Sequence, residues 1–168
     1  FNDLWQFDPV TNEWTWMKGA NSSGSPGSPG IMGVPSATNE PSARHESTCS
    51  WVDNSGDLWT FGGYGNGQTD DLWRYNIATN MWTWMKGDPL ASNSPVYGTM
   101  GIPDPANTPG ARNSYSRWAD KNGNLWLFGR VFYAAGSYTD VWRYSIATNE
   151  WTWMKGPNFT DDAGVYGT

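Results

Sequence analysis

The sequence predicts an all-β protein built from repeated units of four short antiparallel strands. One tryptophan-rich string returns three times, over residues 3–19, 71–87 and 140–156. Copies of a string at a fixed spacing indicate units that bury their apolar surface by stacking on their neighbours. The composition points the same way, because 13 Trp, 8 Tyr and 20 Gly residues favour strands joined by tight turns over helices.

The first complete unit shows the strands in order, as apolar runs between turn residues. Two runs of aromatic and branched side chains flank Asp53-Asn54-Ser55-Gly56, which predicts a hairpin. Gly62-Gly63 ends the second strand, where a positive φ or a close backbone approach is needed. A short turn separates the third strand from a fourth, in which Trp82 and Trp84 share one face. The expected strands are 44–52, 57–61, 72–76 and 81–86.

The same pattern divides the chain into a half unit with only the third and fourth strands, two complete units, and the loops between them. In chain order these are the half unit 1–18, the loop 19–43, the unit 44–86, the loop 87–111, the unit 112–155 and the start of another loop, 156–168. The two complete loops carry Gly, Pro, Met and Asn at matching places. We therefore expect both loops to be ordered rather than flexible.

A double glycine and a spaced pair of aromatic residues mark the repeated unit. Gly62-Gly63 follows the second strand, and Tyr75 and Trp82 come later with six residues between them. The aromatic pair recurs in the other units as Tyr144 with Trp151 and as Phe7 with Trp14. This pattern resembles the kelch repeat, and the resemblance implies kelch-type β-propeller blades of four antiparallel strands each.

The resemblance implies an incomplete ring. Propellers close with about 4 to 8 blades, whereas this chain holds two blades and a half. We expect a segment of a larger propeller, with an open or intermolecularly completed array as the alternative. Two features depart from the kelch pattern: the period exceeds the usual length of about 50 residues, and Gly129 is followed by Arg130 rather than a second glycine. We expect a remodelled turn there, because a non-glycine residue avoids the left-handed region.

Charge and hydropathy exclude two classes of partner. The net charge is −6, with 16 acidic against 10 basic residues, so no clustered Lys and Arg surface indicates nucleic-acid binding. No apolar run approaches the roughly 20 residues of a membrane-spanning helix, so we expect no membrane insertion.

The counts of cysteine and histidine argue against the common catalytic and metal centres. Cys49 and His45 are single in the chain, which excludes an intrachain disulfide and a site with two thiolates or two imidazoles. A kelch-type copper radical oxidase needs several histidine ligands, and this chain lacks them. We expect no enzymatic activity, no metal and no cofactor, and we expect Cys49 to be a buried thiol inside a strand. The carboxylate pairs Asp70-Asp71 and Asp161-Asp162 are weak calcium candidates, and solvated loop charge is the preferred interpretation.

Two arginines at matching places are the first candidates for ligand binding. Arg44 and Arg112 are expected to begin the first strand of each complete unit, and the resemblance implies that this strand lies beside the central channel. A guanidinium there is suited to bind a carboxylate with two hydrogen bonds. The preferred interpretation, by a small margin, is an ion pair between blades or a bond to loop carbonyls. The remaining candidates are His45, next to Arg44, and the loop residues Tyr64, Tyr97, Tyr133 and Tyr138.

Aromatic residues and glycosylation sequons bear on the partner and the compartment. The repeated tryptophans at equivalent strand positions favour core packing over a sugar-stacking surface. Asn21 and Asn158 begin sequons at equivalent places, five residues after Trp16 and Trp153. Their shared placement favours an extracellular or cell-surface glycoprotein.

These observations predict a non-enzymatic, extracellular kelch-repeat scaffold. Its partner would be another protein or copies of itself, bound through exposed blade edges and long loops. A carbohydrate-binding propeller module that uses the loop tyrosines with Arg44 or Arg112 is one alternative. A non-catalytic portion of a larger propeller enzyme is another, since fold alone does not imply function.

Overall fold

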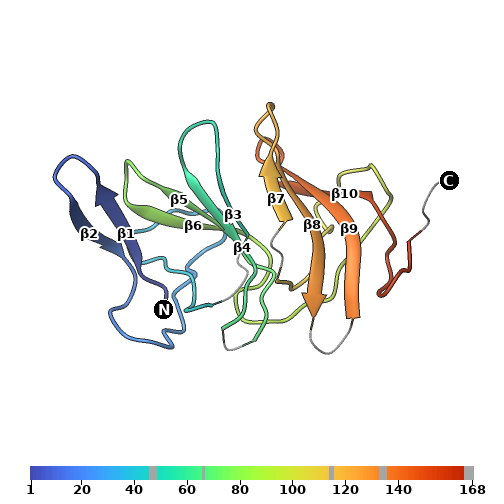
Figure 1. Cartoon of the computed structure of the whole chain (residues 1–168), viewed down its shortest axis with the longest axis horizontal. Coiled ribbons are helices and arrows are strands. Elements are labelled where there is room, and N and C mark those ends of the chain that lie inside the picture. Colours follow the sequence, from blue (N-terminus) through green and yellow to red (C-terminus); the bar gives the residue numbers. More distant parts are fainter. Residues whose placement is uncertain (46–48, 66, 114–115, 133–135, 165–168) are drawn as a thin grey trace.

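The computed structural model describes residues 1–45, 49–65, 67–113, 116–132 and 136–164, and within these ranges the fold is all-β. Ten strands form three antiparallel sheets of two, four and four strands. The sheets follow one another in chain order along the long axis of the molecule (Figure 1). The prediction of an all-β fold with four-stranded antiparallel units is therefore confirmed.

The first and middle sheets contain the strands that the sequence predicts for the half unit and the first complete unit. The first sheet pairs β1 (Leu4–Asp8) with β2 (Glu13–Lys18). The middle sheet has the order β3-β4-β5-β6, so each strand pairs with the next along the chain. Its strands are β3 (Cys49–Val52), β4 (Leu58–Phe61), β5 (Leu72–Asn76) and β6 (Met81–Lys86).

The last sheet repeats this order with a longer central hairpin. Its strands are β7 (Ser116–Ala119), β8 (Leu125–Phe132), β9 (Gly136–Ser145) and β10 (Glu150–Lys155). The ladder shifts register at Gly129, which has φ 71°, and the Arg130 backbone then pairs with Tyr138. In the middle sheet, by contrast, Gly62 and Gly63 both have positive φ and end the strand. The last sheet thus lacks the second glycine and has the longer hairpin, in agreement with the predicted change of the turn at Arg130.

The first strand of neither complete unit begins at the predicted arginine. β3 begins at Cys49 and β7 at Ser116, and neither Arg44 nor Arg112 lies in a strand. The physical reason is that both guanidinium groups turn toward buried carboxylates of their own sheet. The Arg44 amide then donates to the carbonyl of Phe1, 3.1 Å away, rather than to a neighbouring strand. Part of the expected strand start, residues 46–48, lies outside the described ranges.

The middle and last sheets pack through an aromatic core. Trp59 and Phe61 on β4 face the last sheet, where their rings lie 5.7 Å from Tyr144 and 5.2 Å from Trp151. The buried cluster also contains Cys49, Trp51, Leu72, Leu125, Leu127 and Trp142. The expectation that Cys49 is buried inside a strand is therefore confirmed.

The opposite face of the middle sheet packs on the first sheet. Trp73, Tyr75 and Trp82 form a second buried cluster, and Leu4 of β1 packs against it. Side chains alternate between the faces of a strand, so Trp5 and Phe7 of β1 lie on the face away from the middle sheet. The middle and last sheets therefore each have an aromatic face on both sides, whereas the first sheet has aromatic side chains on its outer face and Leu4 on the face toward the middle sheet.

The two long loops make the same hydrogen bonds, as their shared register predicted. Gly33 donates its amide to the carbonyl of Trp84, and Gly101 donates to Trp153. The side chain of Asn39 donates to the carbonyl of Trp82 at 3.1 Å, and that of Asn107 donates to Trp151 at 3.1 Å. Each loop thus covers the outer strand of the sheet that follows it.

Candidate functional site

A buried arginine, aspartate and tryptophan meet in each complete unit. In the middle sheet, Arg44 Nη1 and Nη2 donate to Asp71 Oδ1 and Oδ2 at 2.9 and 2.7 Å, and Trp73 Nε1 donates to Oδ2 at 2.6 Å. The Arg44 guanidinium also donates to the carbonyl of Gly62 at 3.0 Å. We call this group the Arg–Asp–Trp triad.

The last sheet has the same triad in a more buried form. Arg112 donates to both carboxylate oxygens of Asp140 at 3.0 and 3.1 Å, and Trp142 Nε1 donates to Oδ2 at 2.7 Å. The side chains of Arg112 and Asp140 are both 0% exposed. Asp71 directly precedes β5, whereas Asp140 lies within β9. Each triad thus joins the segment ahead of the first strand to the third strand or its start.

The triads fix the role of the two arginines and correct one expectation from the sequence. Arg44 and Arg112 bind carboxylates and carbonyls, as the preferred interpretation expected, but each carboxylate belongs to the arginine's own sheet rather than to a neighbouring one. Asp70-Asp71 is not solvated loop charge, since both residues are buried. Two features of the sequence could have predicted these ion pairs. An arginine precedes an aspartate by nearly the same number of residues in both complete units, and that aspartate always begins an Asp-apolar-Trp string.

Asp70 anchors the long loop that follows the middle sheet. Its carboxylate accepts hydrogen bonds from the Asp88 amide, Asn93 Nδ2 and Thr108 Oγ1 at 3.1, 3.1 and 3.2 Å. Burial nevertheless raises the pKa of Asp70, and the nearby Asp71 charge adds to the rise. The equivalent residue of the half unit is Asn2, whose side chain accepts from the Ala20 amide at 2.9 Å.

The half unit carries an incomplete triad. Trp5 Nε1 donates to Asp3 Oδ2 at 2.7 Å, as in the complete units. Within the described ranges, however, no arginine forms an ion pair with Asp3. Asp3 is exposed, whereas Asp71 and Asp140 are completely buried.

Two of the candidate tyrosines lie beside the last triad: Tyr97 in the long loop, and Tyr138, which is in β9 rather than in a loop as predicted. Tyr97 donates its hydroxyl to Asp140 Oδ2 at 2.9 Å, and its ring lies 6.5 Å from Tyr138. Trp142 and Trp153 also contact the Tyr97 ring, at 5.3 and 5.0 Å. Burial, helped by the Asp140 charge, raises the pKa of Tyr97 far above its usual range. Tyr97 is thus a structural part of the fold that joins the long loop to the triad.

The other candidates separate into a surface pair and one residue that is not described. His45 and Tyr64 form a reciprocal backbone bridge, and their exposed side chains meet edge to face at 5.4 Å. Tyr133 lies outside the described residues. The structure therefore brings Arg112, Tyr97 and Tyr138 together but does not gather all the candidates into one site.

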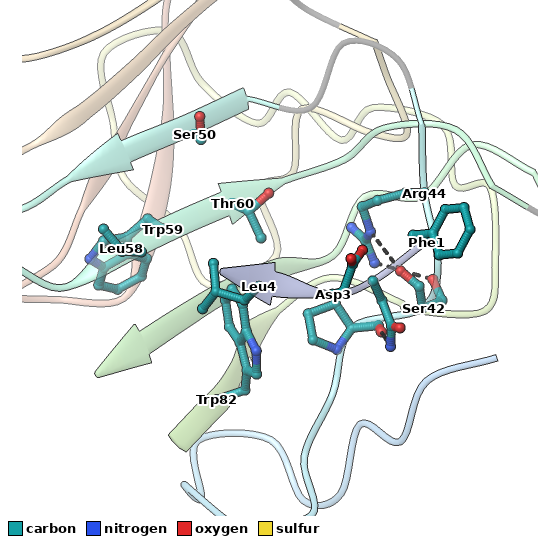
Figure 2. Close-up of a pocket in the computed structure, with 12 residues that line it drawn as sticks. Phe1, Asp3, Leu4, Ser42, Arg44, Ser50, Leu58, Trp59, Thr60 and Trp82 are labelled. Atoms are coloured by element: carbon teal, nitrogen blue, oxygen red, sulfur yellow. Dashed lines mark hydrogen bonds between the residues drawn. The ribbon is translucent and has the colours of Figure 1, made fainter. Parts of the chain in front are cut away.

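A pocket of about 280 Å³ lies between the first and middle sheets. Its apolar lining includes Leu4, Leu58 and Trp82, and Asp3 and Arg44 supply opposite charges, as Figure 2 shows. Leu58 and Thr60 are half-buried there, although their counterparts in the last sheet, Leu125 and Leu127, are 0% exposed. Leu125 and Leu127 are more buried because side chains of β4 in the middle sheet pack on them. Leu58 and Thr60 lack such a cover, because within the described ranges the first sheet consists of β1 and β2 and has no strand equivalent to β4.

Aromatic side chains are exposed on the outer face at each end of the row of sheets. On the first sheet, Trp5, Phe7 and Trp14 are 49, 42 and 64% exposed. Their counterparts in the last sheet, which are Trp142, Tyr144 and Trp151, are 0, 0 and 1% exposed. We call the exposed set the first outer face.

The last sheet ends the row with a second outer face. Trp118 and Phe128 are 44 and 42% exposed, and Trp118 stacks on Trp126 at 5.6 Å. Their counterparts in the middle sheet, Trp51, Phe61 and Trp59, are buried against the last sheet. The preference for core packing is thus correct for the inner tryptophans and wrong for Trp14 and Trp16, which are exposed.

Metal binding and membrane insertion are the remaining possibilities for the described part of the chain. Within it, no group of three or more His, Cys, Asp or Glu side chains is placed to hold a metal ion, and no helix is long and apolar enough to cross a membrane. Asn21 and Asn158, the sequon asparagines, are both exposed. Comparison with known protein families and with curated proteins found no match to this chain.

Proposed function

We propose that the protein is a non-enzymatic, extracellular scaffold of kelch-type propeller blades that assembles with copies of itself through its two outer faces. The observation that carries the proposal is the exposure of both faces, because their counterparts inside the molecule are buried against each other. The carboxylates and guanidinium groups of the two triads form ion pairs with each other, which favours a structural over a catalytic role for these groups.

The internal contact between the middle and last sheets serves as the template for assembly. Trp59 packs on Tyr144 and Phe61 on Trp151 in that contact. If the last sheet of one molecule packs on the first sheet of the next in the same way, Trp126 contacts Phe7 of the next molecule. Phe128 then contacts Trp14 of that molecule. An interface of this kind is head to tail, so it produces a ring where the rotation closes and an open array where it does not.

Sedimentation velocity across a range of protein concentrations tests this proposal. We expect the weight-average sedimentation coefficient to rise with concentration, and to rise further in salt, which screens repulsion between chains of net charge −6. A protein that stays monomeric at every concentration up to about 1 mM would contradict assembly. This concentration corresponds to a binding free energy of about −4 kcal/mol.

The extracellular part of the proposal has its own test. Asn21 and Asn158 are exposed in turns that directly follow β2 and β10. We expect peptide mapping of the natively produced protein to find N-linked glycan on both asparagines. Unmodified asparagines at both positions in the native protein would remove this support.

Carbohydrate binding is the second candidate, and the exposed indole rings favour it. Trp14 and Trp16 are 64 and 50% exposed, and aromatic faces of this kind suit pyranose rings. A titration with oligosaccharides, followed by tryptophan fluorescence, separates the two functions. A saturable response that is lost in Trp14→Ser would favour sugar binding over assembly through the same face.

A further inference from the structure

A second pocket, of about 280 Å³, lies between the two long loops and the connection from β4 to β5. We call it the loop pocket. Its lining includes Ser42 of the first long loop, Gly67 and Thr69 of the connection, and Pro89, Leu90 and Ser92 of the second long loop. Each of these residues has a described counterpart in the last unit. A comparison of the two units therefore shows which residues open the pocket, whatever adjoins the first or last sheet.

The last unit places a carboxylate of its own at the equivalent position. Asp161 Oδ1 accepts a hydrogen bond from the Ser137 amide at 2.9 Å, and the Asp161 amide donates to the Ser137 carbonyl at 2.8 Å. A Cβ atom added to Gly136 would lie 2.3 Å from Asp161 Oδ2. The Asp161 carboxylate thus rests directly on the backbone at the start of β9.

The middle unit has smaller side chains at the same positions. Ser92 replaces Asp161, and Thr69 replaces Tyr138. Gly67 is the counterpart of Gly136, yet within the described ranges no atom lies within 4 Å of the place of its Cβ. The loop pocket therefore arises from residue differences between the units, and it is open where the last unit holds a carboxylate.

Hydroxyl groups supply the hydrogen-bond donors of the loop pocket. Ser42 Oγ accepts a hydrogen bond from Arg44 Nη2 at 3.2 Å, so the hydrogen of this hydroxyl is left to donate elsewhere. Thr69 and Ser92 add two further hydroxyls to the lining. An ionised carboxylate accepts hydrogen bonds and donates none, so it matches this set of donors.

Two nearby acidic residues limit how tightly an anion can bind. Asp70 follows Thr69 in the chain and accepts three hydrogen bonds from the second long loop. Asp88 accepts a hydrogen bond from the Leu90 amide at 2.8 Å. Both carboxylates are held by donors of the protein and repel a further anion, so we expect weak binding.

We propose that the loop pocket binds a carboxylate, either of a small organic acid or of a single acidic side chain. The carboxylate oxygens accept hydrogen bonds from the hydroxyls, and the apolar part of the ligand lies against Pro89 and Leu90. The proposal goes beyond assembly, because neither outer face includes these residues.

Nuclear magnetic resonance of the intact, ¹⁵N-labelled protein tests the proposal, at a concentration where sedimentation shows the monomer. Acetate is the probe, and chloride at equal ionic strength is the reference anion. We expect acetate alone to shift the amide signals of Gly67, Thr69 and Ser92, with saturation in the millimolar range. The methylamide of N-acetylaspartate is the second probe. Tighter binding than acetate would assign the site to an acidic side chain, and weaker binding would assign it to a small acid.

Three variants locate the binding. Thr69→Tyr introduces the residue of the last unit and fills the pocket without a change of charge, so we expect acetate to bind about tenfold more weakly or worse. Ser92→Asp places a carboxylate of the protein at the pocket and is expected to have the same effect. Ser94→Asp is the matched control, because Ser94 is exposed in the same loop but does not line the pocket. We expect it to bind acetate within about twofold of the wild type.

Melting temperatures close to that of the wild type show that each variant folds, and the acetate titrations then decide. Shifts that do not saturate below about 100 mM acetate overturn the proposal. Equal affinity in the wild type and in both Thr69→Tyr and Ser92→Asp also overturns it, as does a loss in Ser94→Asp as large as in Ser92→Asp. These signals come from residues outside both outer faces, so failure of the assembly proposal is recognised separately.

Discussion

At the scale of residues, the fold depends on charges buried in pairs. Breaking a buried ion pair by removing one partner leaves an uncompensated charge, which costs far more than the pair itself contributes. The Arg112 and Asp140 side chains are both 0% exposed, whereas the side chain of Arg74, which pairs with Asp57, is 39% exposed.

The Arg112→Ala substitution tests this contrast. We expect it to lower the free energy of unfolding by about 3–5 kcal/mol, because Asp140 would stay buried without its guanidinium. Arg74→Ala is the control and is expected to cost less, because Arg74 is partly exposed and the buried Asp57 keeps the hydrogen bond from Asn76. Urea denaturation measures both, and equal losses would contradict the structural role of the triad.

Asp70 supplies a pH prediction. Its native pKa is raised above 3.8, so the native state binds the proton more tightly than the unfolded state. The stability that protonation contributes is complete below about pH 3.8 and is lost as the pH rises through the native pKa. We expect Asp70→Asn to remove this loss, because the equivalent Asn2 anchors its loop without a charge.

Thermal unfolding from pH 4 to pH 7 measures the effect as a difference between the two proteins. The difference separates Asp70 from carboxyl groups whose ionisation stabilises the native state. Asp120 is one of these, because its hydrogen bond from Asn124 lowers its pKa to about 2. A constant difference between variant and wild type across this range would show that the Asp70 proton has no influence on stability.

At the scale of elements, the hairpin turns depend on asparagines in the left-handed region. Asn12, Asn80 and Asn149 occupy the same turn position with φ of 60, 54 and 57°. Asn80 also accepts a hydrogen bond from the Tyr75 hydroxyl at 2.8 Å. Phe7 replaces that tyrosine in the first sheet, so Asn12 has only the conformational role.

Glycine substitution separates the two roles of these asparagines. Asn80→Gly is expected to cost about 1 kcal/mol, because glycine tolerates the positive φ but removes the hydrogen-bond acceptor. For Asn12→Gly we expect a change within about 0.5 kcal/mol. Denaturant unfolding of both variants checks the prediction, and a larger loss at Asn12 than at Asn80 would refute it.

The sequence predicted most of the strands, but it predicted fewer of the contacts between side chains of different strands. Turn clusters and alternation placed β4, β5 and β6 within a residue of their observed bounds, because those signals are local. The start of the first strand was wrong, since the carboxylate that draws Arg44 away is 27 residues further along the chain. The partner of a buried charge depends on the folded sheet, so local patterns do not reveal it.

At the scale of the whole molecule, position in the row decides what a repeated residue does. Trp151 and Trp14 are equivalent in sequence, yet they are 1 and 64% exposed. Composition and period predicted the buried interfaces. They did not predict which copies face outward, because that depends on where each unit stands in the row.

Alanine at the two equivalent tryptophans tests this dependence. We expect Trp151→Ala to lower the free energy of unfolding by about 3–5 kcal/mol, through the cavity that it leaves against Phe61 and Tyr144. Trp14→Ala, measured at a concentration where the protein is monomeric, is expected to change stability by less than about 0.5 kcal/mol. Comparable losses would show that the outer face is already covered within one molecule.

If the two outer faces are complementary halves of one interface, as we propose, two variants that each lack one face will associate with each other but not with themselves. Trp14→Ser removes one face and Phe128→Ser removes the other, and both positions are exposed, so each variant is expected to fold. In sedimentation velocity, we predict that each variant alone is monomeric and that an equimolar mixture forms a one-to-one complex through the remaining intact faces. Association of either variant alone, or a mixture that stays monomeric while the wild type assembles, would contradict the head-to-tail account.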